Sequence, residues 1–440
     1  MAKEKQLNIL YMHSHDTGRY IQPYGYAIDT PNLQKFAEEG MLFRKAFTVS
    51  PTCSPSRAAL LTGEMPHSNG MLGLAHRGFS LYNYNHHIVD ILKSLGYKTT
   101  LAGIQHIAEK IDDRTEGWQR IGYDNFLGNH EVAEEKAIEY IATKPEEPFF
   151  MSVGFFETHR EFPEKHPFDN AAYCLPPYPL PDTPENREDM ACFKECARSL
   201  DRKMGAVLDA LSKSGMADNT LVIITTDHGI AFPRMKCNLE DSGTGVMLML
   251  RGPNIGKGKV IDGMITNMDI YPTICELLEI EKPEWLQGKS LLPMINREKD
   301  ELHSAIFAEV NYHVAFEPMR SVRTKEWKYI RRYDKQNHPI LSNCDVGFSK
   351  TTWMDHGWQN SQPKEEALFN LIFDPNEVNN LAGDPDYETI LIEMKSRLRK
   401  EMQRTGDPLL KGDVPLPSTA LVNDRDDLDP SENTLPVGTR

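Results

Sequence analysis

The chain has 440 residues, of which 40% are hydrophobic and 26% are charged, a composition typical of globular proteins rather than disordered ones. This length predicts one large and one smaller domain instead of a single compact unit. The net charge of −15 at pH 7, with no basic block, argues against a nucleic-acid partner. It does not exclude an anionic substrate, because a local cationic pocket can outweigh the overall charge.

Predicted strands and helices alternate along the first half of the chain. Continuous apolar runs predict buried strands, and helical periodicity predicts the segments between them. The pattern predicts a strand at Asn8–Met12, helices at Leu33–Glu39 and His87–Leu95, a strand at Lys98–Ala102, a helix at Glu131–Ala142, a strand at Pro148–Phe155, a helix at Ala191–Ser212 and a strand at Thr220–Thr226. Such alternation indicates a mostly parallel sheet with helices on both faces.

The pattern changes after about residue 300, where short apolar runs replace the long alternation. We expect antiparallel strands at Ala305–Val310, Arg320–Thr324 and Trp327–Arg332, with a helix at Glu388–Arg404 packed on them. From Asp413 onward the tail is rich in Pro, Asp, Ser and Asn, which predicts a segment that wraps the surface or is disordered. The sequence therefore predicts two domains, at residues 1–305 and 306–440.

The N-terminal residues and the cysteines bear on the compartment. Met1–Gln6 leads directly into the first predicted strand without the pattern of a signal peptide, and no stretch approaches the roughly 20 apolar residues of a membrane span. The seven cysteines are irregularly spaced, unlike a disulfide framework. We expect a cytoplasmic protein with no membrane partner; a chain that lacks its leader would look the same.

Chemically active side chains follow three of the predicted strands. His13–Asp16 follows the first, His159 follows the strand at 148–155, and Asp227-His228 follows the strand at 220–226. Sites in parallel sheets form where the carboxyl ends of strands meet. The sequence therefore predicts one site at this edge of the sheet.

Cys53 belongs to a short segment that reads as the start of a helix. Pro55 suits a first helical turn, Ser54 and Ser56 can cap free amides, and Gly63 can end the helix. A helix N-terminus carries partial positive charge that suits an anion, and Arg57 adds a cation one turn away. A lone cysteine in such a place is more often buried and inert, so the surrounding pattern decides.

The run Cys53-Ser-Pro-Ser-Arg57, closed by Leu61-Thr-Gly63, resembles the signature of the sulfatase family. The likeness covers most of the chain, since Asp29–Leu33 precedes the motif and Leu368–Leu371 resembles the family's C-terminal signature. It implies an alkaline-phosphatase-like α/β fold with a mixed, mostly parallel sheet flanked by helices and a smaller C-terminal α+β domain on a short antiparallel sheet. It also implies that a maturase oxidises Cys53 to formylglycine, whose hydrated aldehyde is the nucleophile.

The resemblance further implies one divalent metal. The segment around His15-Asp16 resembles the family's first metal strand, with His15 in place of an acid, and Asp227-His228 resembles the second. His13 competes with His15 for this role. The implied metal set is His15, Asp16, Cys53, Asp227 and His228. Calcium is the family default, whereas two imidazoles would shift the preference toward Mn²⁺, Zn²⁺ or iron.

The remaining catalytic assignments are also carried over from the family. Arg57, with the metal, would favour deprotonation of the attacking hydroxyl, and Lys236 would stabilise charge on the ester oxygens. His106 would help to expel sulfate, and His159 would protonate the leaving group. Ile104 stands where the family has a lysine on the sulfate, so one expected cation is missing. Taken singly, each of these residues is more often a surface or structural residue.

The substrate assignments follow the family's sulfamidase branch, which cleaves N-sulfate groups. The stretches His67–Leu74, Gly229–Pro233 and Pro318–Val322 resemble that branch, and they imply that His313, Arg320 and Asn238 contact the substrate. The implied function is hydrolysis of a sulfate ester or N-sulfate, with N-sulfoglucosamine or another small sulfated sugar as substrate. The sequence is compatible with a homo-oligomer.

Two alternatives remain open at this point. His228 and the missing lysine at Ile104 lean toward a phosphodiester or phosphonate monoester hydrolase of the same fold. The substituted metal acid at His15 leans toward a non-catalytic binding protein in which Cys53 stays a thiol.

Overall fold

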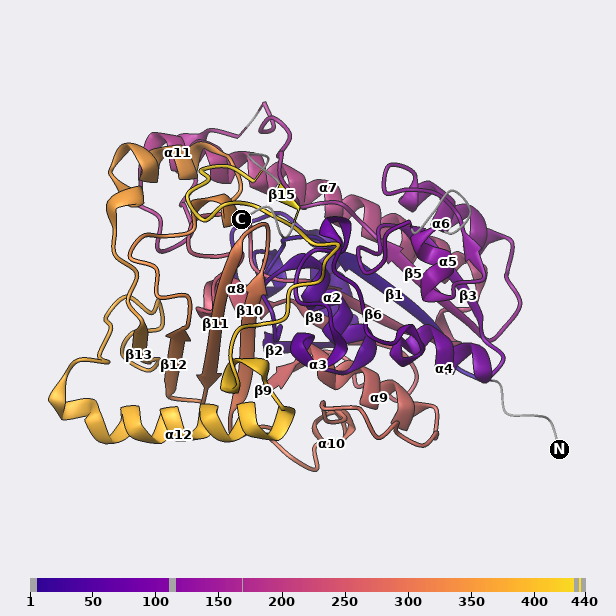
Figure 1. Ribbon diagram of the computed structural model, residues 1–440. Coiled ribbons are helices and arrows are strands. Elements are labelled where there is room, and N and C mark those ends of the chain that lie inside the picture. The colour runs from indigo at the N-terminus through magenta and orange to yellow at the C-terminus, as the bar shows by residue number, and fades with distance from the viewer. Residues whose placement is uncertain (1–5, 111–115, 168, 431–434, 437–440) are drawn as a thin grey trace.

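The computed structural model describes residues 6–110, 116–167, 169–430 and 435–436. Its main feature is a large mixed sheet between two layers of helices, beside a smaller antiparallel sheet (Figure 1). No helix in the described part of the chain is both long enough and apolar enough to cross a membrane.

The large sheet has nine strands among the described residues. They are β1 (Asn8–Ser14), β2 (Met41–Phe47), β3 (Lys98–Gly103), β4 (Asn125–Phe126), β5 (Phe149–Gly154), β6 (Thr220–Thr226), β7 (Gly245–Val246), β8 (Leu248–Arg251) and β9 (Lys259–Thr266). Strands β4, β3, β5, β1 and β6 lie side by side in that order and are parallel. Strand β8 is antiparallel to both β6 and β2, which makes the sheet mixed.

Twelve α-helices accompany the strands in the described ranges. They are α1 (Pro31–Glu39), α2 (Cys53–Thr62), α3 (Pro66–Asn69), α4 (Ile88–Ser94), α5 (Gly117–Ile121), α6 (Ala133–Ala142), α7 (Pro184–Ser214), α8 (Asp241–Thr244), α9 (Ile270–Leu277), α10 (Leu292–Ile295), α11 (Phe348–Asp355) and α12 (Glu388–Thr405).

The alternation of side chains along β1 explains the two helical layers. Ile9 and Tyr11 lie in a buried cluster with residues of α2, α4 and α9, whereas Leu10 and Met12 lie in a second cluster with residues of α1, α6 and α7. Figure 1 shows α7 and α9 on opposite sides of the sheet. Because successive residues of a strand point to opposite faces, a fully apolar strand requires helices on both.

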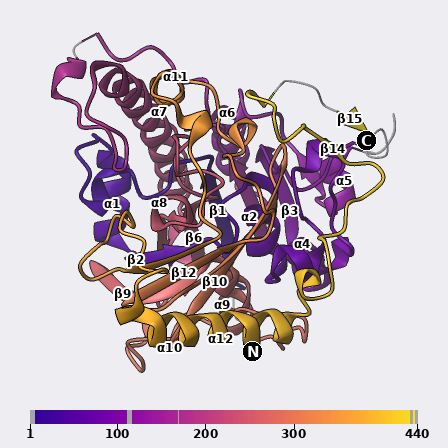
Figure 2. The ribbon, with the colours of Figure 1, turned by 60° about the vertical axis from the view of Figure 1, so that its left-hand side comes forward.

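The small sheet carries its own helix. Its strands are β10 (Ile306–Tyr312), β11 (Phe316–Arg323), β12 (Trp327–Arg332) and β13 (Glu366–Asn370), paired antiparallel in that order. Helix α12 packs its buried face against one side of this sheet and lies across the strands in both views (Figure 2). The division of the chain at residue 305 stays a prediction, although β10 begins at Ile306.

The structure corrects two expectations from the sequence and agrees with one of the two alternatives predicted for the tail. Helix α7 begins at Pro184 rather than Ala191, because Thr183 caps its first turn by accepting from the Asn186 amide at 3.3 Å. Strands β2, β8 and β9 were not expected. The tail up to residue 430 is ordered and wraps the surface, with Val414 and Ala420 buried in the same cluster as Tyr11; β14 (Leu421–Val422) pairs with β15 (Leu435–Pro436).

Candidate active site

The site lies where the carboxyl ends of four neighbouring parallel strands meet, as the sequence predicts. Strands β3, β5, β1 and β6 are adjacent, and the next residues of each carry the polar side chains. These are His106 after β3, His159 after β5, His15-Asp16 after β1 and Asp227-His228 after β6. Asp16 and His106 have φ values of 54° and 56°, so the chain turns sharply at these positions.

Cys53 is the first residue of α2 and is 2% exposed. Gly63 follows the last residue of helix α2 and has a φ of 71°. This left-handed conformation is common just after a helix and is easiest for glycine, which has no side chain. The expected caps are wrong: the Ser54 hydroxyl accepts from the Ala75 amide at 3.0 Å, and Ser56 donates to the Asp227 carbonyl at 2.5 Å. These side chains instead tie α2 to a neighbouring loop and to the end of β6, which fixes Cys53 at the sheet edge.

Cys53 faces a buried cluster of possible metal ligands. One ligand atom each from His15, Asp16, Cys53, Asp227 and His228 can be chosen so that all lie within 4.8 Å of one another. His15 Nδ1 is 2.6 Å from Asp16 Oδ1, and His228 Nε2 is 3.3 Å from that oxygen and 3.4 Å from Cys53 Sγ. Carboxylates and imidazoles that converge in this way form a donor set for a divalent cation.

His13, the competing candidate, lies outside this cluster. Its Nδ1 faces Arg57 Nη1, and its Nε2 is 3.4 Å from the Ser152 hydroxyl. Of the two histidines at the end of β1, the structure therefore brings His15 to the acids.

The charge state of the cluster suits a cation. Burial works to raise the pKa of Asp16, but Lys236, His15 and His228 hold it well below its usual value. The pKa of Asp227 is lowered in the same way against burial, mainly by His228 and Arg57. Both carboxylates are therefore ionised at neutral pH.

The unmodified thiol of Cys53 is a poor nucleophile in this setting. Burial raises its pKa well above the usual value, against the opposing pull of Lys236. Because thiolate rather than thiol is reactive, an encoded cysteine here would stay inert.

Two cations flank the acids. Arg57 Nη2 donates to Asp227 Oδ2 at 2.9 Å and to the Ser14 carbonyl at 3.0 Å, so the guanidinium is fixed beside the cluster. Lys236 Nζ lies 2.9 Å from Asp16 Oδ2 and 3.4 Å from His159 Nε2.

Asp345 is a second carboxylate that pairs with Lys236, and the sequence analysis did not identify it. Its Oδ2 lies 2.9 Å from Lys236 Nζ, and its side chain is 15% exposed. Burial works to raise the pKa of Asp345, but Lys236 and His159 lower it to about 2, so it is ionised. It comes from a loop of the C-terminal part that follows no predicted strand, and no local motif marks it.

His76 is a second residue that sequence reasoning missed. His76 Nδ1 and His106 Nε2 share a hydrogen bond of 2.9 Å, and their rings stack with centroids 5.1 Å apart. The His15 ring lies 5.7 Å from that of His106. The imidazoles of His76 and His106 thus lie together, and His106 is two residues along the chain from Ile104, which replaces the lysine expected from the family.

The three predicted substrate residues have different positions. His313 is buried close enough to Lys236 and Asp345 to feel their charges, and its neighbour Val314 packs on Cys53. Asn238 instead donates to the Lys236 carbonyl at 3.0 Å and lines a separate cavity of about 440 Å³.

Arg320 is not brought to the cluster. Its guanidinium donates to Asp407 Oδ2 at 2.6 Å and to the Val310 carbonyl at 3.1 Å, and it is 2% exposed. The expectation that Arg320 contacts the substrate is therefore not supported by its position, because its partners within the protein occupy the guanidinium.

A cavity lies beside the cluster, on the side of His159 and Asp345. It has a volume of about 550 Å³ and is lined by these two residues together with Arg160, Phe162 and Phe348. Its size suits a small organic ligand.

A mixed α/β sheet with a buried cysteine, paired acids and flanking cations at its carboxyl edge is an arrangement suited to a hydrolase of anionic esters. A family model described as sulfatase matches residues 8–280, and one described as the C-terminal region of N-sulphoglucosamine sulphohydrolase matches residues 233–344. The chain belongs to the sulfatase family, and its chemistry is the hydrolysis of sulfuric esters.

Individual relatives agree with this assignment. The chain is 28% identical to human N-sulphoglucosamine sulphohydrolase, over 93% of this chain and 92% of that protein. It is 27% identical to an ulvan-active sulfatase of Formosa agariphila, over 98% of this chain and 79% of the relative.

Solved structures share the fold. A protein crystallised with its substrate D-glucosamine-2-N,6-O-disulfate superposes with a TM-score of 0.68 at 18% identity, covering 92% of this chain and 99% of that one. The phosphonate monoester hydrolase of Agrobacterium radiobacter gives a TM-score of 0.68 at 19% identity, with coverage of 91% and 96%.

Proposed function

We propose that the protein hydrolyses N-sulfate groups, or sulfate esters, of a sulfated saccharide, with formylglycine derived from Cys53 as nucleophile and one divalent metal. The observation that carries the proposal is the convergence of Cys53 with Asp16, Asp227 and His228 beside two buried cations. The relative named N-sulphoglucosamine sulphohydrolase, similar over 93% of the chain, supports the substrate class.

The residues present fit a divalent metal. The two ionised carboxylates and two imidazoles would hold it together with the modified Cys53, and a bound metal would polarise the nucleophile and the sulfate oxygens. A mixed oxygen and nitrogen donor set favours Mn²⁺, Zn²⁺ or iron over Ca²⁺.

Conversion of Cys53 removes the obstacle of its high pKa. A hydrated aldehyde supplies one hydroxyl that attacks sulfur and a second that later expels sulfate. Conversion is a two-electron oxidation that replaces the thiol by a carbonyl oxygen and releases the sulfur as sulfide. It therefore requires a maturase that supplies the oxidant, and we propose such a maturase as a partner of this chain.

The flanking side chains have separate roles in the proposed reaction. Arg57 is held by Asp227 and Ser14, so it presents a fixed charge beside the position of the nucleophile. Lys236 would bind a sulfate oxygen, and His159 would protonate the leaving group from the cavity side. His106, paired with His76, would take up the proton of the hydroxyl that expels sulfate.

Asp345 favours an N-sulfate over an O-sulfate. Cleavage of an S–N bond releases an amine that takes up a proton, whereas cleavage of an S–O bond releases a neutral alcohol. An ionised carboxylate next to His159 would stabilise the developing ammonium charge and would gain nothing from an alcohol.

Two measurements test the proposal. Mass spectrometry of the Cys53 peptide, from protein coexpressed with a maturase, should show formylglycine. Turnover of N-sulfoglucosamine should exceed that of an aryl sulfate and of an aryl phosphodiester, and Cys53→Ala should abolish it without lowering the melting temperature.

The alternatives have distinct outcomes in the same experiments. His228 beside Asp227, with Ile104 in place of a cation, also suits a phosphodiester or phosphonate monoester hydrolase. Phosphodiester turnover that exceeds both sulfated substrates by orders of magnitude would establish that function instead. An unmodified thiol in protein from the native host would support the non-catalytic binding protein.

A further inference from the structure

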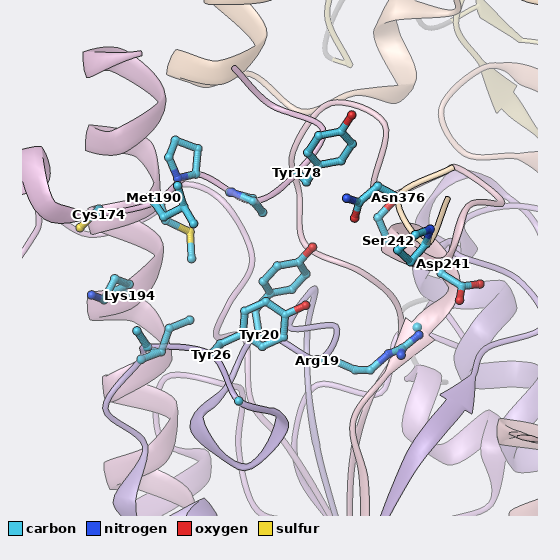
Figure 3. Close-up of a pocket in the computed structure, with 18 of the residues that line it drawn as sticks. Arg19, Tyr20, Tyr26, Cys174, Tyr178, Met190, Lys194, Asp241, Ser242 and Asn376 are labelled. Carbon is cyan, nitrogen blue, oxygen red and sulfur yellow. The ribbon is translucent and has the colours of Figure 1, made fainter. Parts of the chain in front are cut away.

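A second cavity contains none of the residues of the catalytic cluster. It has a volume of about 690 Å³ and is bordered by the loop after β1, the segment before α7, helix α7 itself and the loop after β13. Figure 3 shows an open space with Tyr20 and Tyr26 below it, Tyr178 above it, Lys194 on one side and Asn376 on the other. We call it the tyrosine cavity.

Tyrosine rings dominate its surface. Tyr20 and Tyr26 lie with ring centroids 4.5 Å apart, and the rims carry Tyr178, which is 48% exposed, and Tyr173, which is 89% exposed. Aromatic faces combined with hydroxyl and amide groups suit a ligand that has apolar C–H faces and many hydroxyls. A saccharide has both properties.

The cations of the tyrosine cavity are free to bind an anion. Within the described part of the chain, Arg19 and Lys194 form no ion pair, and Arg19 Nη2 is buried without a hydrogen-bond partner. The Arg19 guanidinium lies over the ring of Phe47, with its Cζ 4.9 Å from the centroid, and close enough to Asp241 to lower the pKa of that carboxyl group without forming an ion pair with it. A buried N–H without a partner is costly unless a ligand supplies the acceptor.

The acids of the same wall are already neutralised. Asp241 lies 2.8 Å from Arg323 Nη2 and 2.7 Å from Lys328 Nζ, and Glu377 lies 2.9 Å from the same ammonium. The unpaired charge that faces the cavity is therefore positive, in a protein whose net charge is −15.

Helix α7 places the tyrosine cavity near the cavity beside the catalytic cluster. Met190 and Lys194 line the tyrosine cavity, whereas Asp189 and Cys192 of the same turns line the other cavity with His159 and Asp345. The two cavities thus flank one helix, whose width is about 10–12 Å. A short oligosaccharide is long enough to span this width.

We propose that the tyrosine cavity is a second binding site for an anionic sugar unit of an oligosaccharide whose other end occupies the catalytic site. The proposal rests on the proposed function in that it takes the substrate to be a sulfated saccharide. Stacking on Tyr178 and contact with Lys194 and Arg19 select the sulfate- or carboxylate-bearing unit, and longer chains bind more tightly than monosaccharides.

Binding to the Cys53→Ala protein tests the proposal without turnover. Isothermal titration would compare N-sulfoglucosamine with a heparan sulfate tetrasaccharide and an ulvan tetrasaccharide. Lys194→Ala and Tyr178→Ala should each weaken binding of a tetrasaccharide about tenfold and leave the monosaccharide unchanged, since one charge-assisted contact or one ring contact is lost. Tyr178→Phe, which keeps the ring, should bind nearly as the parent does.

Lys213→Ala is the matched control, because Lys213 is exposed on the same helix outside the cavity. Equal tetrasaccharide affinity in all variants, or no binding of either tetrasaccharide, would overturn the proposal. Parallel loss of monosaccharide affinity would also overturn it, because the residues would then act on the catalytic site. Failure of the proposed function appears separately, as absence of N-sulfoglucosamine turnover by the intact enzyme.

Discussion

Replacing Glu309 by Gln should destabilise the protein without impairing its chemistry. Glu309 lies on β10, is fully buried and ion-pairs with His67 Nδ1; it also accepts from the His67 amide at 2.9 Å and from Asn311 Nδ2 at 3.0 Å. Arg320 Nε lies 3.8 Å away and continues the chain of charges to Asp407. This network joins the small sheet to the segment that follows α2.

The magnitude follows from the pKa of the carboxyl group. Burial works to raise it, but His67 and Arg320 lower the pKa of Glu309 to about 2 from 4.5. A difference of about 2.5 units corresponds to about 3.4 kcal/mol of stability at neutral pH, close to the roughly 3–5 kcal/mol expected when one member of a buried ion pair is removed.

The stability contributions of Glu309 and His67 depend on pH in opposite directions. Because the folded pKa of Glu309 is depressed, its contribution is complete above pH 4.5 and is lost as the pH falls toward 2. The pKa of His67 is raised, against burial, by Glu309, so its contribution is complete below pH 6.5 and is lost as the pH rises through the raised value. The pair therefore contributes most between about pH 4.5 and 6.5.

Urea unfolding at several pH values measures this effect. Glu309→Gln should unfold at lower urea and lose less stability in acid than the parent, while Glu326→Gln, in the exposed turn between β11 and β12, should behave as the parent. The kcat/KM of the folded variant on N-sulfoglucosamine should be unchanged, since Arg320 is a structural residue. An unchanged unfolding midpoint, or a large rise in KM at normal stability, would refute this reasoning.

Two further substitutions test the site itself. Asp345→Asn should lower kcat/KM for N-sulfoglucosamine by about 10–100-fold and leave an aryl sulfate nearly unaffected, because only the amine leaving group uses the carboxylate. An equal loss on both substrates would show that Asp345 acts only by positioning Lys236. Gly103→Ala should destabilise the end of β3, since Gly103 has a φ of 85° and its added Cβ would lie 2.1 Å from the Gly154 carbonyl oxygen. A melting temperature within 1–2 °C of the parent, on the order of what a few tenths of a kcal/mol produce, would contradict that expectation.

Elements with a strong local pattern could be predicted from the sequence. Thr220–Thr226 is a continuous β-branched and apolar run, and it forms β6 with the expected bounds. Strand β2 was missed because Arg44 and Lys45 interrupt its apolar run, yet its outer residues still pack between β8 and β9. Pairing of distant segments compensates for a weak local signal there.

The site residues also divide into those marked by a local sequence pattern and those that depend on the packing of distant segments. Residues at the ends of apolar strands, such as Asp16 and Asp227, could be found because the topology of a parallel sheet brings such ends together. Asp345 and His76 could not be found, since their approach depends on how separate loops pack over the sheet edge. Arg320 was misassigned because its partner Asp407 lies far along the chain, so no residue near Arg320 in the sequence indicates that its guanidinium already has a partner.

The charge balance of the cluster indicates where substrate selection must occur. Apart from the histidines, the three carboxylates Asp16, Asp227 and Asp345 face the two cations Arg57 and Lys236, which leaves one excess negative charge. A divalent metal would turn this into one excess positive charge, which complements any monoanion. Sulfate monoesters, N-sulfates and phosphodiesters all carry a single negative charge, so the anion side of the site accepts each of them. Under the proposed function, selection therefore depends on the side where Asp345 lies near His159, the proposed leaving-group acid, and on contacts with the rest of the substrate.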